Sequence, residues 1–365
     1  ETLYTEKKEV AVHSDITDEK QSVYLPKIQT KAEDAITKIN HTEANKTATI
    51  VDTVSYTNLL PGREYTVSGT LMDKETGKAV LADGKEITAS TTFTPEKSEG
   101  SVDVIFIFDA SIVAPKTVVA FETLTYKKIQ IAVHAEIEDK EQTVYIPKVR
   151  TSAIDKTTKI NHTEATKEAT IIDTVSYEGL EIGREYTVKG VLMNQRTGKA
   201  VTVDGKEVTA ETTFTAETRD GSVQVVFTFN ASVLEGTTTV VFEKLYTENK
   251  EVGSHSDIYD KNQTVYIPKI RTTAISDDTK DHVTKADEQI TLIDTVQFTS
   301  LEVGREYTVS GKLMNRATNE PILVGGREVT AETTFTPETT DGTVDVTFTF
   351  DGTGLEDTVV VVFET

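Results

Sequence analysis

The sequence contains no cysteine and no tryptophan among its 365 residues. The absence of cysteine excludes disulfide bonds and thiolate metal sites, but it does not identify the compartment, because a protein can be secreted without disulfides. No apolar run approaches the length of roughly twenty residues that a membrane-spanning helix needs. We therefore expect a soluble segment without a metal or other cofactor.

Basic residues are also scarce relative to acidic ones. The chain has 38 Lys and Arg against 60 Asp and Glu, which gives a formal net charge of −22 at pH 7. Binding to phosphate groups requires clustered positive charge. The composition therefore argues against nucleic acid and anionic membrane as partners, whereas cationic or carbohydrate partners remain open.

An internal repeat organises the chain. Sliding the sequence by 121 residues aligns Glu1 with Glu122, Glu243 and Glu364 without a net gap. Such self-similarity indicates a tandem array. We expect two complete domains at residues 27–147 and 148–268. Residues 1–26 then form the final strands of a preceding copy, and residues 269–365 form a copy that lacks its last strands.

Within each copy, apolar side chains recur at every second position. Residues 65–71 and 102–108 alternate in this way, and this period is typical of strands with one buried face. Gly-containing turns, such as Pro61-Gly62 and Asp83-Gly84, separate the alternating segments. The pattern predicts an all-β, immunoglobulin-like sandwich in each copy. Short linkers around Pro147 and Pro268, without Gly or Ser, predict a rod-like array.

Two carboxylates interrupt apolar strand segments. Asp52 lies in Thr49–Val54 and Glu122 follows Val118–Phe121. Strand acids usually face solvent, since charged residues are rarely buried. The joint recurrence of these acids in every copy weakens that interpretation. If the two carboxyls of a copy approach each other in the core, one of them should hold a proton. The later copies supply Asp173 with Glu243, and Asp294 with Glu364.

A histidine precedes a glutamine by eight residues in three places. These pairs are His13 with Gln21, His134 with Gln142, and His255 with Gln263. A second set of histidines lies in a polar loop and slips by one residue in the third copy. We expect this set to lie at the surface: His41, His162 and His282.

These motifs carry a resemblance that covers the whole chain. The Val-Ala-Phe-Glu run ending at Glu122, the Asp-Thr-Val run at residues 52–54, and the His-x7-Gln spacing recur in order. The sequence resembles the VaFE repeat family, the ester-bond domains of Gram-positive surface adhesins. In that family a Thr on the first strand and a Gln on the last strand join through a self-formed ester.

The resemblance implies a role for each recurring residue. Thr30 matches the nucleophile, Gln142 the electrophile, Asp52 with Glu122 the acid pair, and His134 the supporting residue. Thr53 is an alternative nucleophile because it also recurs, but it lies in a later strand than Thr30. The same roles fall on further residues in the other copies: Thr151, Asp173, Glu243, His255 and Gln263; then Thr272, Asp294 and Glu364; and His13 with Gln21.

The implied function is a structural stalk on the bacterial cell surface, anchored through regions outside this chain. The hydroxyl and the carboxamide are both weakly reactive, so the ester requires a base, a proton source for ammonia and enforced contact. This reaction runs once per domain, so no enzymatic turnover is expected. The alternative is a ligand-binding adhesin module for a host protein or glycan.

The incomplete ends of the chain are complementary. Thr272, Asp294 and Glu364 lack a His and a Gln in their own copy, whereas His13 and Gln21 lack a Thr and an acid pair. One expectation is that two chains complete this site head to tail, since missing strands invite exchange. The other is that the chain is a segment of a longer array.

Overall fold

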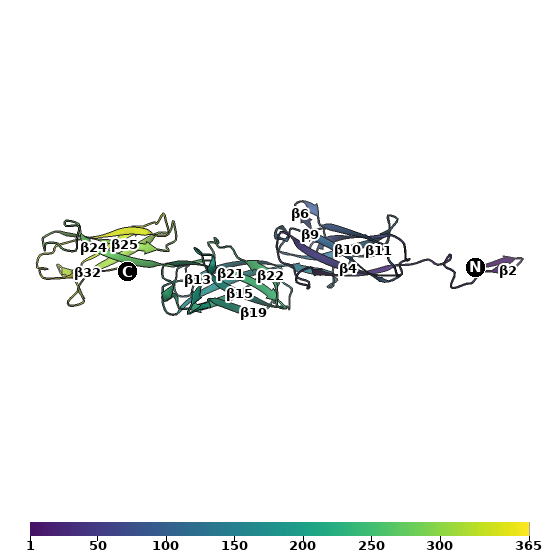
Figure 1. The fold of residues 1–365 in the computed structure, drawn as a ribbon, viewed down its shortest axis with the longest axis horizontal. Helices are drawn as coiled ribbons and strands as arrows, with labels where there is room; N and C mark the ends of the chain where they lie inside the picture. Colours follow the sequence, from purple (N-terminus) through teal and green to yellow (C-terminus); the bar gives the residue numbers. More distant parts are fainter. Residues whose placement is uncertain (365) are drawn as a thin grey trace.

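The computed structural model describes residues 1–364. Three β-sandwiches lie end to end along one axis, and a separate hairpin lies beyond the first sandwich at the N-terminal end (Figure 1). All strand pairs within these residues are antiparallel. The all-β, immunoglobulin-like architecture and the rod-like array expected from the sequence are both confirmed. Within residues 1–364, no helix has the length and apolar character needed to cross a membrane.

The first sandwich consists of two main sheets. One has the strand order β3-β4-β9, and the other has the order β11-β10-β5-β8 with β12 also paired to β10. The strands are β3 (Lys27–Asp34), β4 (Ala48–Thr57), β5 (Tyr65–Asp73), β6 (Leu81–Ala82), β7 (Lys85–Glu86), β8 (Thr88–Phe93), β9 (Gly100–Phe108), β10 (Lys116–Tyr126), β11 (Ile129–His134) and β12 (Thr143–Ile146), with the short helix η1 (Ala110–Ile112) between β9 and β10.

The alternation in sequence becomes the core between these sheets. Val67 and Leu71 on β5 face Val104 and Phe106 on β9, and all four are fully buried. Gly69 lets the two sheets approach, because a Cβ at this position would lie 2.5 Å from the Phe106 ring. The same Gly–Phe contact recurs in the other two sandwiches, so close approach of the sheets is a property of the repeat.

The second sandwich repeats this topology. Its sheets have the order β13-β14-β20 and β16-β15-β21-β22, with β19 on β15 and β23 on β21. The elements are β13 (Lys148–Asp155), β14 (Ala169–Glu178), β15 (Glu185–Asn194), β16 (Lys199–Ala200), β17 (Thr202–Val203), β18 (Lys206–Glu207), β19 (Thr209–Thr215), β20 (Gly221–Phe229), η2 (Ala231–Val233), β21 (Thr237–Thr247), β22 (Lys250–His255) and β23 (Thr264–Ile267).

The third sandwich has no counterpart of β22 and β23 within the described residues. Its last strand, β32, pairs with β26 alone. In the repeat frame, β1 (Thr2–Thr5) matches the end of β21, β2 (Lys8–Val12) matches β22, and residues 22–25 match β23. The hairpin of β1 and β2 is exposed throughout. The third sandwich comprises β24 (Lys269–Ser276), β25 (Ile290–Thr299), β26 (Tyr307–Asn315), β27 (Glu320–Pro321), β28 (Leu323–Val324), β29 (Arg327–Glu328), β30 (Thr330–Phe335), β31 (Gly342–Phe350) and β32 (Val360–Glu364).

Candidate cross-linking site

The two recurring carboxylates meet between the sheets. Asp52 points inward from β4 of the three-stranded sheet, because it occupies a buried position in the alternation of that strand. Glu122 points inward from β10 of the opposite sheet. Both residues are fully buried, and their carboxyl groups lie within hydrogen-bonding reach of each other. The buried pair expected from the sequence is therefore present, and the solvent-facing alternative is wrong.

Thr30 and Gln142 converge on the same carboxylate. Thr30 lies at an inward position of β3, and Gln142 immediately precedes β12, so the two residues come from the first and last strands of the sandwich. The Thr30 hydroxyl donates to Glu122 Oε2 at 3.2 Å. Gln142 Nε2 donates to the same oxygen at 2.7 Å and to Thr30 Oγ1 at 2.5 Å. One carboxylate oxygen thus contacts both groups that an ester bond would join.

The second sandwich reproduces this constellation. Gln263 Nε2 donates to Glu243 Oε2 at 2.5 Å and also contacts the Thr151 hydroxyl. Thr30 and Thr151 are each 7% exposed, and both glutamines are fully buried. The geometry is therefore a property of the repeat unit.

The acid pair holds a proton at neutral pH. Burial, followed by the hydrogen bond and the charge of Asp52, raises the pKa of Glu122 far above its usual range. Burial and the neighbouring Asp173 do the same to the pKa of Glu243. Two carboxylates in a low-dielectric site cannot both ionise at low cost, so each pair carries one shared proton.

Unpartnered buried side-chain atoms gather at this constellation. Within the described residues, all such oxygen and nitrogen atoms except Arg219 Nε and Ser276 Oγ belong to the recurring site residues. They include both oxygens of Asp52, and the Glu122 Oε1 and Gln142 Oε1 atoms. Buried polar atoms are normally hydrogen-bonded, so each exception requires an explanation. A proton shared between facing carboxyl oxygens accounts for the acid pair, whereas Gln142 Oε1 is left without a partner.

The site is closed to water by apolar neighbours. Gly69 is the strand partner of Glu122, and the Phe106 ring packs against that glycine. Val54 and Val104 beside Asp52 are fully buried. A dry site protects a reactive acyl group from hydrolysis.

His134 lies beside the acid pair and is held by a residue that sequence reasoning missed. Its Nε2 atom lies 2.9 Å from Asp139 Oδ2, while its buried Nδ1 atom has no partner. The second Asp139 oxygen accepts from the Glu141 backbone amide at 2.8 Å, in the turn that leads to Gln142. The recurrence of this aspartate five residues after each histidine was the signal available in the sequence.

Comparison with known families identifies the type of domain. The family model for the T-Q ester bond containing domain matches residues 26–146, 147–267 and 268–365. The chain belongs to this family. Among curated proteins, no sequence matches significantly.

The solved structures that match this chain do so at low sequence identity and low TM-score. An adhesin from Mobiluncus mulieris, described as containing intramolecular disulfide, isopeptide and ester bond cross-links, is 15% identical with a TM-score of 0.30. The match covers 68% of this chain and 87% of that chain. A glycosyl hydrolase family 2 member from Bacteroides cellulosilyticus is 8% identical with a TM-score of 0.27, over 74% of this chain and 33% of that one.

The third TQ domain assembles only part of the site. Asp294 is fully buried, and Glu364 lies within hydrogen-bonding reach of Asp294 and Thr272. Thr272, however, is exposed. His13 and Gln21 lie in the exposed N-terminal segment, where His13 Nε2 contacts Asp18 Oδ2 at 2.8 Å. No complete Thr-Gln pair is therefore formed by these residues. Within residues 1–364, no group of side chains is arranged to hold a metal ion.

Two other expectations are decided by the structure. The alternative nucleophile Thr53 points away from the acid pair and donates to Asp103 at 2.8 Å. The expectation that His41 and His162 lie at the surface is wrong, because both are buried where one domain meets the next. His282 is exposed, as expected.

Proposed function

We propose that each complete TQ domain joins its first and last strands through a self-formed ester between threonine and glutamine. The units are residues 27–147, with Thr30 and Gln142, and residues 148–268, with Thr151 and Gln263. The observation that carries the proposal is the double contact of Glu122 Oε2 with the Thr30 hydroxyl and the Gln142 amide nitrogen. Family membership supports the same reaction.

The reaction balances with the groups present. Thr30 Oγ1 attacks the Gln142 carboxamide carbon while its proton passes to Glu122 Oε2. The resulting tetrahedral centre collapses as the same carboxyl gives a proton to the departing nitrogen, which leaves as ammonia. Asp52 shares the other proton of the pair with Glu122 Oε1. The pair therefore carries one negative charge before attack and after ammonia leaves, and it is neutral while it holds the threonine proton. Contact between reactants replaces the strong activation that weak nucleophiles otherwise require.

His134 stabilises the negative charge that develops during attack. Asp139 fixes its Nε2 atom, which leaves Nδ1 facing the buried site. A positioned hydrogen-bond donor in a water-excluded site lowers the energy of an oxyanion. His255 and Asp260 take these roles in the second domain, where the two side chains lie 2.7 Å apart.

The bond closes almost the whole domain into a loop. By the chain-entropy relation used for disulfides, closure of a loop of on the order of 100 residues stabilises the fold by roughly 4 to 5 kcal/mol. Force entering at β3 and leaving at β12 would pass through the ester and leave the core unloaded. The benefit resembles that of a disulfide, in a chain without cysteine.

This chemistry suits a stalk region of a bacterial surface adhesin. The repeated domains lie in a rod (Figure 1), and the Mobiluncus mulieris protein with ester cross-links is itself described as an adhesin. The chain would act at the cell surface as a spacer, with single-turnover cross-linking as its only chemistry.

The split site extends the proposal to self-association. Thr272, Asp294 and Glu364 of one chain would be completed by His13 and Gln21 of another. In this arrangement β2 supplies the strand that β22 provides in the second domain, and residues 22–25 supply the segment that matches β23. The exposed apolar side chains of the hairpin, including Leu3 and Val10, support this docking.

Intact mass under denaturing conditions tests the cross-links. The proposal predicts a deficit of two ammonia molecules, one of which returns with Thr30→Ala and the other with Thr151→Ala. A mass that matches the unmodified sequence would leave a plain β-sandwich stalk. Peptide mapping then checks that the joined residues are the predicted pairs.

A further inference from the structure

One buried imidazole lies at each junction between domains. At the first junction, His41 Nε2 lies 2.7 Å from the Tyr186 hydroxyl of the following domain, 145 residues along the chain. At the second, His162 Nε2 lies 2.6 Å from the Tyr307 hydroxyl. His41 is fully buried and His162 is 8% exposed. The array thus repeats the same contact between neighbouring copies.

The hydrogen bonds at the first junction select the neutral imidazole. Asn40 Oδ1 lies 3.0 Å from His41 Nδ1, and an amide oxygen can only accept, so Nδ1 carries the proton. The Tyr186 hydroxyl accepts from the Glu181 backbone amide at 2.9 Å. Its own hydrogen is therefore available for His41 Nε2, which must be unprotonated to accept it.

The second junction supports the same assignment independently. Arg305 Nη1 donates to Asn161 Oδ1 at 3.1 Å, and Asn161 Nδ2 donates to Glu302 Oε2 at 3.3 Å. These contacts fix the orientation of the amide. Its oxygen then accepts from His162 Nδ1 at 3.0 Å.

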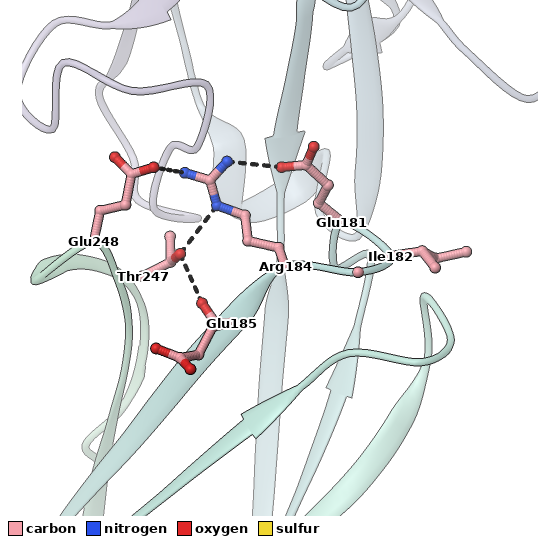
Figure 2. Close-up of a pocket in the computed structure, with 7 residues that line it drawn as sticks. Glu181, Ile182, Arg184, Glu185, Thr247 and Glu248 are labelled. Atoms are coloured by element: carbon pink, nitrogen blue, oxygen red, sulfur yellow. Dashed lines mark hydrogen bonds and ion pairs between the residues drawn. The ribbon is translucent and has the colours of Figure 1, made fainter.

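The charge of a guanidinium group acts on each imidazole. Arg184 is held between Glu181 and Glu248, at 2.9 and 2.8 Å (Figure 2). Burial, and then the positive charge of Arg184, lowers the pKa of His41 to about 3. Burial and Arg305 lower the pKa of His162 to about 4, against an opposing effect of Glu302.

The imidazole is also clamped by its own domain. The His41 ring stacks on Tyr145 of β12, with ring centroids 5.0 Å apart, and the Tyr145 amide donates to the Asn40 carbonyl at 2.9 Å. His162 stacks on Tyr266 in the same way, at 5.1 Å. Each loop therefore connects the last strand of one domain to the next domain.

We infer that the Asn-His loop of one copy and the tyrosine of the following copy form a docking interface that requires a neutral imidazole. The array is therefore stiff at neutral pH, and its joints open in acid. His41 contacts Asn40, Tyr145 and Tyr186. The nearby charged group is Arg184, which is paired with Glu181 and Glu248. A histidine in an open joint ionises near its usual pKa, whereas a docked one stays neutral.

The sign of the pH effect follows from the difference in pKa between the histidine of an open joint and the docked histidine. Docking is fully favoured above the ordinary histidine pKa of about 6.5 and weakens as the pH falls toward the docked value. Each pH unit below about 6.5 reduces the docking equilibrium constant up to tenfold, or about 30-fold at about pH 5.

Distance measurements between spin labels test the joint in the full chain. The chain lacks cysteine, so labels attach only at introduced sites. Lys85→Cys with Lys206→Cys reports the first joint, and Lys206→Cys with Arg327→Cys reports the second, at exposed positions in register. The inference predicts a narrow distance distribution at neutral pH and a broad one at about pH 5.

Matched variants separate the joint from folding. Tyr186→Phe and His41→Ala should broaden the first distribution at neutral pH and remove its pH dependence, while the second stays narrow. Tyr65→Phe, the same residue in the first domain, loses a hydroxyl that binds only the Leu60 backbone and should change neither.

Circular dichroism of each variant establishes that the sandwiches are folded. If Tyr186→Phe unfolds its domain, the first joint is tested with the His41→Ala loop variant alone. A first joint that remains narrow in His41→Ala overturns the inference. A wild-type distribution that stays unchanged at about pH 5 does so too, as does a His41 imidazole that titrates near the exposed His282 in NMR spectra.

Discussion

The second and third TQ domains carry the same threonine and acid pair in different surroundings. Asp173 and Asp294 are both fully buried. Thr151 is 7% exposed, whereas Thr272 lies at an exposed position of β24. Glu243 is fully buried, but Glu364 is only partly covered. The difference coincides with β22 and β23, which flank β21 in the second domain and have no counterpart beside β32 in the part of the chain that the structure describes.

The comparison separates two contributions of the last strands. In the third domain, strands β24 to β32 already bring the acid pair and the threonine together, because Glu364 lies within hydrogen-bonding reach of both Asp294 and Thr272. The last strands add the glutamine and the histidine, and they cover the site. In the third domain Val359 and Phe363 are left about half exposed, at 57% and 45%. The acid pair and the threonine therefore come together without the last strands, whereas the glutamine and the exclusion of water depend on them.

The largest expected effect is loss of the cross-link in the second domain. Glu243→Gln preserves the shape of the protonated acid but removes the oxygen that accepts protons from Thr151. We expect the second ester to be absent, with one ammonia regained in the intact mass. The domain should lose roughly 4 to 5 kcal/mol of its free energy of unfolding, the value of loop closure. Chemical denaturation measures that loss.

Glu364→Gln is the matched control for this change. It alters the same position of the repeat in the third domain, where residues 1–364 place no glutamine beside Thr272, so the mass deficit of this chain should remain two ammonia molecules. An unchanged deficit in Glu243→Gln would show that the acid pair is not needed for bond formation.

The next effect should appear when the third domain receives the missing strands. At high protein concentration, residues 1–26 of one chain should dock on β32 of another and form a Thr272–Gln21 ester. We expect a ladder of covalent oligomers on a denaturing gel, which is lost in Thr272→Ala. A monodisperse monomer by light scattering, without a ladder, would contradict the docking.

A smaller effect is expected in the pH dependence of stability. Thr151→Ala keeps the second acid pair free of the cross-link for this comparison. Burial and Asp173 raise the pKa of Glu243 from 4.5 to about 10. Burial and Asp294 raise that of Glu364 to about 8. The folded state binds the extra proton, so this stabilisation is complete below the unfolded pKa and is lost as the pH rises through the folded value.

The thermal midpoints of the two domains should therefore respond over different windows. The second domain should keep losing stability up to about pH 10, whereas the third should level off near pH 8. Glu243→Gln in the Thr151→Ala background should flatten the curve of the second domain. Identical pH profiles for the two domains would show that the last strands do not control the environment of the acid pair.

Much of this arrangement was accessible from the sequence because its signals are local or periodic. Alternation on β4 and β10 placed Asp52 and Glu122 on inward faces, and the fixed period identified them as a recurring pair. The approach of the two carboxyl groups required the packing of opposite sheets. This packing depends on the contact of Gly69 with Phe106, which no local pattern reveals.

The joints between domains illustrate the limit of sequence reasoning. His41 lies among polar residues, and such a loop usually faces solvent. Its burial comes from Tyr186 of another domain and from Tyr145 of a strand distant in sequence. Only the array as a whole determines that environment. Asp139 was missed for another reason. The chain has many aspartates, and only the contact with His134 distinguishes this one.

The smallest effect concerns this aspartate, and the chain contains its own control. Asp260→Asn weakens the hold on His255 and on the turn before Gln263 while Thr151, Glu243 and Gln263 stay in place. Cross-linking of the second domain in newly synthesised protein should slow by up to about a hundredfold, the lower range for loss of one oxyanion-stabilising donor, and its pH profile should shift. Asp18→Asn breaks the same pair with His13 outside any complete site, so both rates should be unchanged. Equal slowing of the two domains by either variant would point to a general folding defect, because a positioning role acts only on the site that contains the aspartate.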